Sequence, residues 1–199
     1  MKSKMFVYGL LAFAISTTAF AKNHHKSHDN DTDNGSGGLD NTVVLVIRHA
    51  EKPDQGPELA PAGVLRANRY VDYFKNYTVD SVPMPPKSLF AAAISKDSQR
   101  PVLTITPLSH ALGLPIDSRF KDSKSTDLAA ELRGKPHGKC VLICWHHSEI
   151  PDLMRALGAD PGQVIPGSKW PGSVFNWVIQ LRYDQDGKLI DIKRIEEPF

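Results

Sequence analysis

The chain has 199 residues, of which 41% are hydrophobic and 23% are charged, a composition typical of one globular domain with a sizeable core. Its 24 lysines and arginines nearly balance its 22 aspartates and glutamates, which gives a formal net charge of +2. This balance argues against a protein that binds nucleic acid or an anionic membrane surface through its overall charge.

Residues 1–21 have the pattern of a signal peptide. Lys2 and Lys4 precede an apolar stretch over residues 5–14, and Ala19-Phe20-Ala21 forms a cleavage site with small residues at both ends. The apolar stretch is shorter than the roughly 20 residues that a membrane-spanning helix needs. We therefore expect cleavage, no membrane insertion afterwards, and an exported protein that is either periplasmic or secreted.

Residues 22–40 form a polar tract with one large apolar residue, Leu39. Such a tract cannot build a core, so we expect a disordered linker. Its histidines and aspartates could bind a divalent metal loosely, although a solvated tail with adventitious affinity is the simpler interpretation. The folded domain is then expected over residues 41–199.

The domain alternates between apolar strands and amphipathic helices. A strand is expected near residues 42–48, followed by a helix near 62–76 whose apolar positions, Val64, Ala67, Val71 and Phe74, recur at helical intervals. Further strands are expected near 88–94 and 139–145, an edge strand near 114–116, helices near 98–112, 125–133 and 150–158, and a terminal hairpin over 173–182 and 188–195.

This alternation predicts an α/β fold. We expect a three-layer sandwich in which helices cover both faces of a mostly parallel central sheet, with the antiparallel C-terminal hairpin at one edge. Cys140 and Cys144 lie in one predicted strand, where their Cα atoms would be about 13 Å apart. That separation is too long for a disulfide, so both are interpreted as small core residues.

Three of the predicted strands are followed by residues that carry chemistry. Arg48 and His49 follow the first strand, residues 95–100 follow the second, and His146 and His147 follow the third. The carboxyl ends of parallel strands meet at one edge of a sheet, so these side chains can converge there. Arginine offers a planar fork for phosphate oxygens, and histidine can act as a nucleophile. The pattern predicts a pocket for a phosphate dianion.

Together these residues resemble the histidine phosphatase superfamily, which has the phosphoglycerate-mutase-like fold. The motifs that carry the resemblance are Arg48-His49-Ala50-Glu51, then Leu59, Gly63 and Ala67, then Ser95, Arg100 and Thr104, and finally His146 with Ile150-Pro151-Asp152-Leu153. The resemblance covers most of residues 42–160.

The resemblance implies that His49 is the nucleophile that forms a phosphohistidine, while Arg48 and Arg100 hold the phosphoryl group. A second histidine completes the phosphate pocket. Spacing from the strand points to His146, whereas some relatives place this histidine where His147 stands. The resemblance also implies that no metal or other cofactor is needed, because the arginines and histidines supply the positive charge.

Two further roles follow from the same resemblance. Ser95 and Glu51 are placed beside the arginines as substrate-binding residues. Many members carry an acid that protonates the leaving oxygen, and here Asp122 is the first candidate. Asp127 and Glu51 are the alternatives.

The sequence therefore predicts an exported phosphatase that hydrolyses phosphomonoesters through a phosphohistidine intermediate on His49. The expected substrate is a small phosphorylated molecule or, by resemblance to some exported relatives, a phosphate group of the cell envelope. The alternatives are a catalytically degenerate member that binds phosphorylated ligands without turnover and, less favoured, a phosphomutase. No nucleic-acid partner is expected, and the sequence does not define the oligomeric state.

Overall fold

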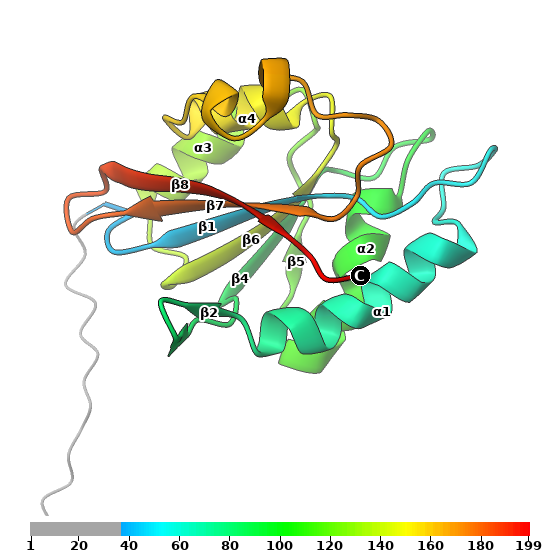
Figure 1. Ribbon diagram of the computed structural model, residues 1–199, viewed down its shortest axis with the longest axis horizontal. Helices are drawn as coiled ribbons and strands as arrows, with labels where there is room; N and C mark the ends of the chain where they lie inside the picture. Colours follow the sequence, from blue (N-terminus) through cyan, green and yellow to red (C-terminus); the bar gives the residue numbers. More distant parts are fainter. Residues whose placement is uncertain (1–36) are drawn as a thin grey trace, which may run out of the picture. The chain divides into compact units, whose positions relative to one another are not determined.

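The computed structural model describes residues 37–199 (Figure 1). The predicted signal peptide and residues 22–36 of the predicted linker lie outside the described residues. Residues 38–41 form a turn, in which the side chain of Leu39 is 2% exposed and belongs to the hydrophobic core. The packed structure therefore includes residues just before position 41.

The central sheet has six strands in the order β5-β4-β6-β1-β7-β8. The first four strands in this order are mutually parallel, and the last two continue the sheet as an antiparallel pair at one edge. This arrangement confirms the predicted fold class. The strands are β1 (Val43–Arg48), β4 (Ser88–Ala91), β5 (Ile116–Asp117), β6 (Cys140–Trp145), β7 (Trp177–Tyr183) and β8 (Leu189–Glu196).

Helices cover both faces of this sheet (Figure 1). Helices α1 (Pro61–Lys75) and α2 (Arg100–Leu112) pack on one face, and α3 (Ser125–Gly134) and α4 (Ile150–Ala156) pack on the other. Every residue of β1 is buried, because its side chains alternate between the two layers of core. Leu45 faces α1 and α2, whereas Val44 and Val46 face α3 and α4.

Helix α1 buries a different stripe from the one expected. Its buried residues are Gly63, Ala67, Tyr70 and Phe74, while Val64 is 48% exposed. Gly63 lies against the loop after β1, where a Cβ atom at this position would come within 2.5 Å of the carbonyl oxygen of Glu51. The close approach of this loop leaves no room for a side chain at position 63, and the glycine faces inward.

The structure also departs from the expected strands in several places, among them β7, which begins at Trp177 rather than near residue 173. The second strand ends at Ala91 rather than near residue 94, and the edge strand β5 begins at Ile116 rather than near 114. A short hairpin of β2 (Thr78–Val79) and β3 (Val82–Pro83) was not expected. Its turn residues Asp80 and Ser81 both have positive φ, the geometry of a tight two-residue hairpin.

Cys140 and Cys144 are both buried and free, as predicted. No helix within residues 37–199 is both long and apolar enough to cross a bilayer.

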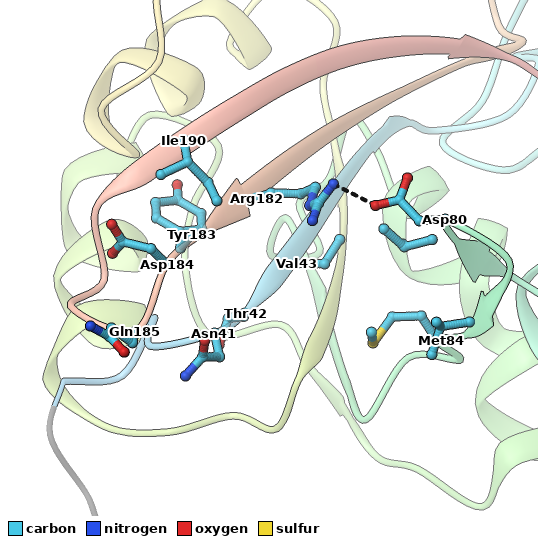
Figure 2. A pocket seen from close by; sticks show the side chains of 12 residues that line it. Asn41, Thr42, Val43, Asp80, Met84, Arg182, Tyr183, Asp184, Gln185 and Ile190 are labelled. Atoms are coloured by element: carbon cyan, nitrogen blue, oxygen red, sulfur yellow. Dashed lines mark hydrogen bonds and ion pairs between the residues drawn. The ribbon is translucent and has the colours of Figure 1, made fainter.

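A cavity of about 530 Å³ opens at the amino end of β1, where Val43, Tyr183 and Ile190 contribute to its wall (Figure 2). The ion pair between Arg182 and Asp80, at 2.8 Å, crosses one side of it. Strand β1 advances about 3.3 Å per residue, so this cavity lies about 20 Å from the residues that follow the strand's carboxyl end. It is separate from the site described next.

Candidate active site

The pairing of β1 with β6 brings two of the predicted site segments together. Arg48 lies opposite Trp145 at the end of the parallel register, and the backbone N–H of His49 donates to the Trp145 carbonyl at 3.0 Å. His146 follows Trp145 directly. The imidazole centroids of His49 and His146 are consequently 5.1 Å apart, with the rings inclined at 67°.

His49 is held as a neutral imidazole with one defined tautomer. Its side chain is 3% exposed, and Nδ1 lies 2.7 Å from the carbonyl oxygen of Ala50. A carbonyl oxygen only accepts, so Nδ1 carries the proton and Nε2 keeps its lone pair. Burial lowers the pKa of His49 to about 3, and the neighbouring His146, Arg48 and Arg100 act in the same direction. The ring is therefore uncharged at neutral pH, with the lone pair of Nε2 available.

Arg48 is almost fully buried, and its guanidinium group is oriented by the loop over residues 171–175. Its Nη1 donates to the carbonyl oxygens of Gly172 at 2.7 Å and Val174 at 2.9 Å, and its guanidinium carbon lies 3.7 Å from the centroid of the Phe175 ring. Burial lowers the pKa of Arg48 to about 10, against the charge of Glu51, which raises it. The side chain therefore remains cationic at neutral pH.

Arg100 is the first residue of α2, and its guanidinium group is also oriented by backbone carbonyl oxygens. Its Nη1 donates to the carbonyl oxygen of Gly56 at 3.0 Å, and its Nη2 donates to that of Asp97 at 3.1 Å. Burial lowers its pKa, and the charge of Glu58 opposes this effect.

The Nε–H groups of both Arg48 and Arg100 are buried and have no hydrogen-bond partner among the described residues. A buried donor without an acceptor is unfavourable by about 1–3 kcal/mol. The two guanidinium groups also act on one another and on His49 electrostatically. The arrangement is suited to an anion that can accept hydrogen bonds from the Nε–H groups of both arginines.

The two neighbouring histidines have different surroundings. Burial lowers the pKa of His146, while the Asp122 carboxylate raises it and the two arginines lower it further. Burial likewise lowers the pKa of His147, which is affected next by Arg48, His146 and the exposed Lys52. The structure thus brings the ring of His146 against His49, whereas His147 lies near Arg48, His146 and Lys52.

Thr104 joins the loop after His49 to α2. Its hydroxyl accepts from the backbone N–H of Ala50 at 2.9 Å and donates to the carbonyl oxygen of Arg100 at 2.8 Å. This one side chain therefore fixes the backbone around His49 relative to the first turn of the helix that carries Arg100. The sequence offered Thr104 only as a motif residue, without a role.

The two residues predicted to bind substrate beside the arginines have other contacts. Ser95 is exposed, and its hydroxyl accepts from the backbone N–H groups of Asp97 and Ser98 in the turn before α2. Glu51 is held by Arg66, whose Nε and Nη2 donate to one carboxylate oxygen at 3.0 and 2.9 Å.

The remaining candidates for the general acid differ in their surroundings. Asp122 is half-buried: one carboxylate oxygen accepts from the Ser123 N–H at 2.8 Å, and its carbonyl oxygen accepts from the indole N–H of Trp145 at 3.1 Å. Asp127 is exposed and lies 3.6 Å from the ammonium nitrogen of Lys124 in an ion pair. Within residues 37–199, no group of three or more His, Cys, Asp or Glu side chains could hold a metal ion.

The loop over residues 170–175 is the part of the site that sequence reasoning missed. Its contribution to Arg48 comes from backbone carbonyls and one aromatic face, and the loop itself is closed by the Trp170 indole N–H, which donates to the Val174 carbonyl at 2.9 Å. Any residue type supplies a carbonyl, so no side-chain pattern could have identified it.

Comparisons with known proteins agree with this architecture. No protein-family model and no curated protein sequence matches the chain. A mycobacterial glucosyl-3-phosphoglycerate phosphatase aligns with a TM-score of 0.50 at 15% identity, covering 78% of this chain and 98% of that chain. The histidine phosphatase SixA in complex with tungstate gives 0.48 at 13% identity, covering 78% and 97%. A phosphoglycerate mutase from Plasmodium falciparum gives 0.48 at 19% identity, covering 77% and 89%.

The sequence identities are low, so what the mycobacterial structure establishes is the fold. The chain has the fold of the histidine phosphatase superfamily. The predicted resemblance is confirmed at that level.

The low pKa of His49 has a measurable effect on stability. Between about pH 6.5 and pH 3 the unfolded chain takes up a proton at His49 that the folded chain does not, so the free energy of unfolding falls as the pH falls through this range. In urea unfolding, we expect wild type to lose about 2–3 kcal/mol more than His49→Asn between pH 7 and pH 4. Equal losses in the two proteins would contradict the neutral, desolvated state of this imidazole.

Proposed function

We propose that this chain is an exported phosphatase of the histidine phosphatase superfamily, which hydrolyses phosphomonoesters through a phosphohistidine on His49. The observation that carries the proposal is the lone pair of a buried, neutral His49 beside two cationic arginines whose buried Nε–H groups lack partners. Export is supported by the amino-terminal sequence alone, and recovery of a processed chain that begins near Lys22 would establish it.

In the first step, Nε2 of His49 attacks phosphorus, forming the N–P bond as the ester O–P bond breaks. Negative charge is spread over the equatorial phosphoryl oxygens, where Arg48, Arg100 and His146 stabilise it. The leaving oxygen takes a proton from the carboxyl group of Asp122. In the second step, water attacks phosphorus and gives its proton back to the Asp122 carboxylate, the N–P bond breaks, and phosphate leaves.

The assignment of Asp122 as the acid rests on the surroundings of the three candidates. The Asp122 carboxylate acts electrostatically on His146, which contacts the nucleophile. Asp127 pairs with Lys124 on α3, and Glu51 is held in hydrogen bonds by Arg66. Among the three candidates, Asp122 is thus the one that lies near a site histidine and has no ion-pair partner within residues 37–199.

The first prediction concerns the nucleophile. His49→Ala should lower kcat/KM for p-nitrophenyl phosphate by at least about a thousandfold, because the covalent route is removed. Acid-labile labelling of wild type by a ³²P-phosphoester, absent in the variant, would identify the intermediate. Equal hydrolysis by both proteins would exclude His49 as the nucleophile, and a labelled enzyme that releases no phosphate would favour the degenerate alternative.

A second prediction separates the adjacent histidines. His146→Ala should lower kcat/KM by about 10²–10³-fold, the loss typical of removing one transition-state donor. His147→Ala is matched in chemistry, but the ring that contacts His49 is that of His146, so the loss in His147→Ala should be at least tenfold smaller. The reverse order in the same steady-state assay would assign the role to His147.

Asp122 is tested through the leaving group. An alkoxide needs a proton to depart, whereas p-nitrophenolate does not, so Asp122→Asn should lower kcat/KM at least tenfold more for an alkyl phosphate than for p-nitrophenyl phosphate. Asp127→Asn serves as the matched control and should show no such difference. If Asp122→Asn lowers kcat/KM equally for both substrates, Asp122 is not the general acid.

A further inference from the structure

Arg66, on α1, joins the C-terminal residues 197–199 to the loop that follows the nucleophile. All three of its guanidinium nitrogens are engaged: Nε and Nη2 donate to Glu51 at 3.0 and 2.9 Å, and Nη1 donates to Glu197 at 2.8 Å and to the carbonyl oxygen of Phe199 at 2.9 Å. The C-terminal end of the chain lies beside α1 in Figure 1. One side chain therefore connects segments that are 146 positions apart, from Glu51 to Glu197.

The C-terminal half of this connection is buried. The Glu197 side chain is 0% exposed, and its second oxygen accepts from the Tyr70 hydroxyl at 2.9 Å. The Phe199 ring packs against Tyr70, with the ring centroids 5.9 Å apart. Burial raises the pKa of Glu197 to about 7, whereas the hydrogen bonds from Tyr70 and Arg66 favour its charged form. The carboxylate that pairs with Arg66 is enclosed by these partners and has little freedom to rearrange. Glu197 thus fixes Arg66.

The other half of the connection reaches the site. Glu51 lies two residues after His49, and its backbone carbonyl accepts from the Ala60 N–H at 2.9 Å and contacts Gly63. Among the charged groups near Arg48, Glu51 has the strongest influence on that guanidinium. Without Arg66, the Glu51 carboxylate would be free to pair with Arg48, on which it already acts electrostatically, and that pairing would compete with a phosphate dianion.

We propose that Arg66 is a positioning residue, which restrains the Glu51 carboxylate so that Arg48 stays free to bind the phosphoryl group. The inference rests on the proposed phosphatase function. Arg66 touches no reacting atom and acts through Glu51. In this proposal Glu51, which the sequence predicted as a substrate-binding residue, is a restrained neighbour of the phosphate site.

The matched control is Arg69 on the same helix. The Arg69 and Arg66 guanidinium carbons lie 5.6 and 5.7 Å from the Phe199 ring centroid, so both contact the same aromatic side chain. Arg69 has no carboxylate partner in an ion pair within residues 37–199, whereas Arg66 has two. Arg66→Gln therefore removes the ion-pair partner of Glu51 and Glu197, whereas Arg69→Gln leaves both of these ion pairs in place.

The experiment measures KM for p-nitrophenyl phosphate and competitive inhibition by inorganic phosphate in the full chain. We expect Arg66→Gln to raise KM and the phosphate inhibition constant about tenfold, with kcat within about threefold of wild type, because ground-state binding of the dianion is weakened. Arg69→Gln should stay within about twofold. The double variant Arg66→Gln/Glu51→Gln should return KM to within about threefold of wild type, because it removes the competing charge.

Equal KM values in Arg66→Gln and Arg69→Gln, or a double variant that stays at the tenfold-raised KM, would overturn the proposal in favour of a merely structural role. If Arg66→Gln does not fold, Arg66→Lys keeps a charge for Glu197 but cannot hold Glu51 through two nitrogens, and the same rescue by Glu51→Gln decides. If wild type hydrolyses no phosphoester, the phosphatase function fails; calorimetric binding of inorganic phosphate to the same variants then tests the role of Arg66 separately.

Discussion

Six consecutive residue pairs join β1 to β6 in parallel register, from Val43 opposite Cys140 to Arg48 opposite Trp145. Both strands are fully buried, and alternate side chains belong to different core layers. A shift of the register by one residue would move each side chain into the other layer and disrupt the packing on both faces of the sheet. The hydrophobic core therefore determines which residues leave the sheet together. The contact between the rings of His49 and His146 follows from that register.

The charges at this edge are held by neutral groups. Arg48 and Arg100 are oriented mainly by backbone carbonyls, which satisfy part of each guanidinium without cancelling its charge. A carboxylate in the same place would bind more strongly and would compete with an incoming phosphate. Glu51 is the nearby carboxylate that could do so, and it is turned towards Arg66. Within residues 37–199, the site combines neutral imidazoles with two arginines that have no ion-pair partner.

Much of this arrangement could be predicted from the sequence because it follows from apolar runs. Arg48-His49 and His146-His147 each lie at the carboxyl end of a strand that is otherwise apolar, so both the strand and its end were visible. The stripe on α1 was ambiguous because Ala67 and Phe74 belong to two possible faces, and only contact with the Glu51 backbone selects the face of Gly63.

Other features left no signal in the sequence. The carbonyls of residues 172–174 depend on backbone position, not on residue type. The link between Glu51, Arg66 and Glu197 depends on three charged residues that each resemble ordinary surface positions in the sequence. Ser95 fitted a motif, yet its hydroxyl is engaged by the backbone N–H groups of its own turn.

Both edge strands of the sheet have features that disfavour pairing with a strand from another molecule. At one edge, β5 pairs through only two residues, which offers too short a template for a strand from another molecule. At the other edge, β8 carries charges of both signs, with Asp191 3.4 Å from Lys193 and Arg194 3.7 Å from Glu196. An incoming strand would have to bury or displace these charges. The same open sheet that exposes its strand ends to a ligand thereby resists aggregation through its unpaired edges.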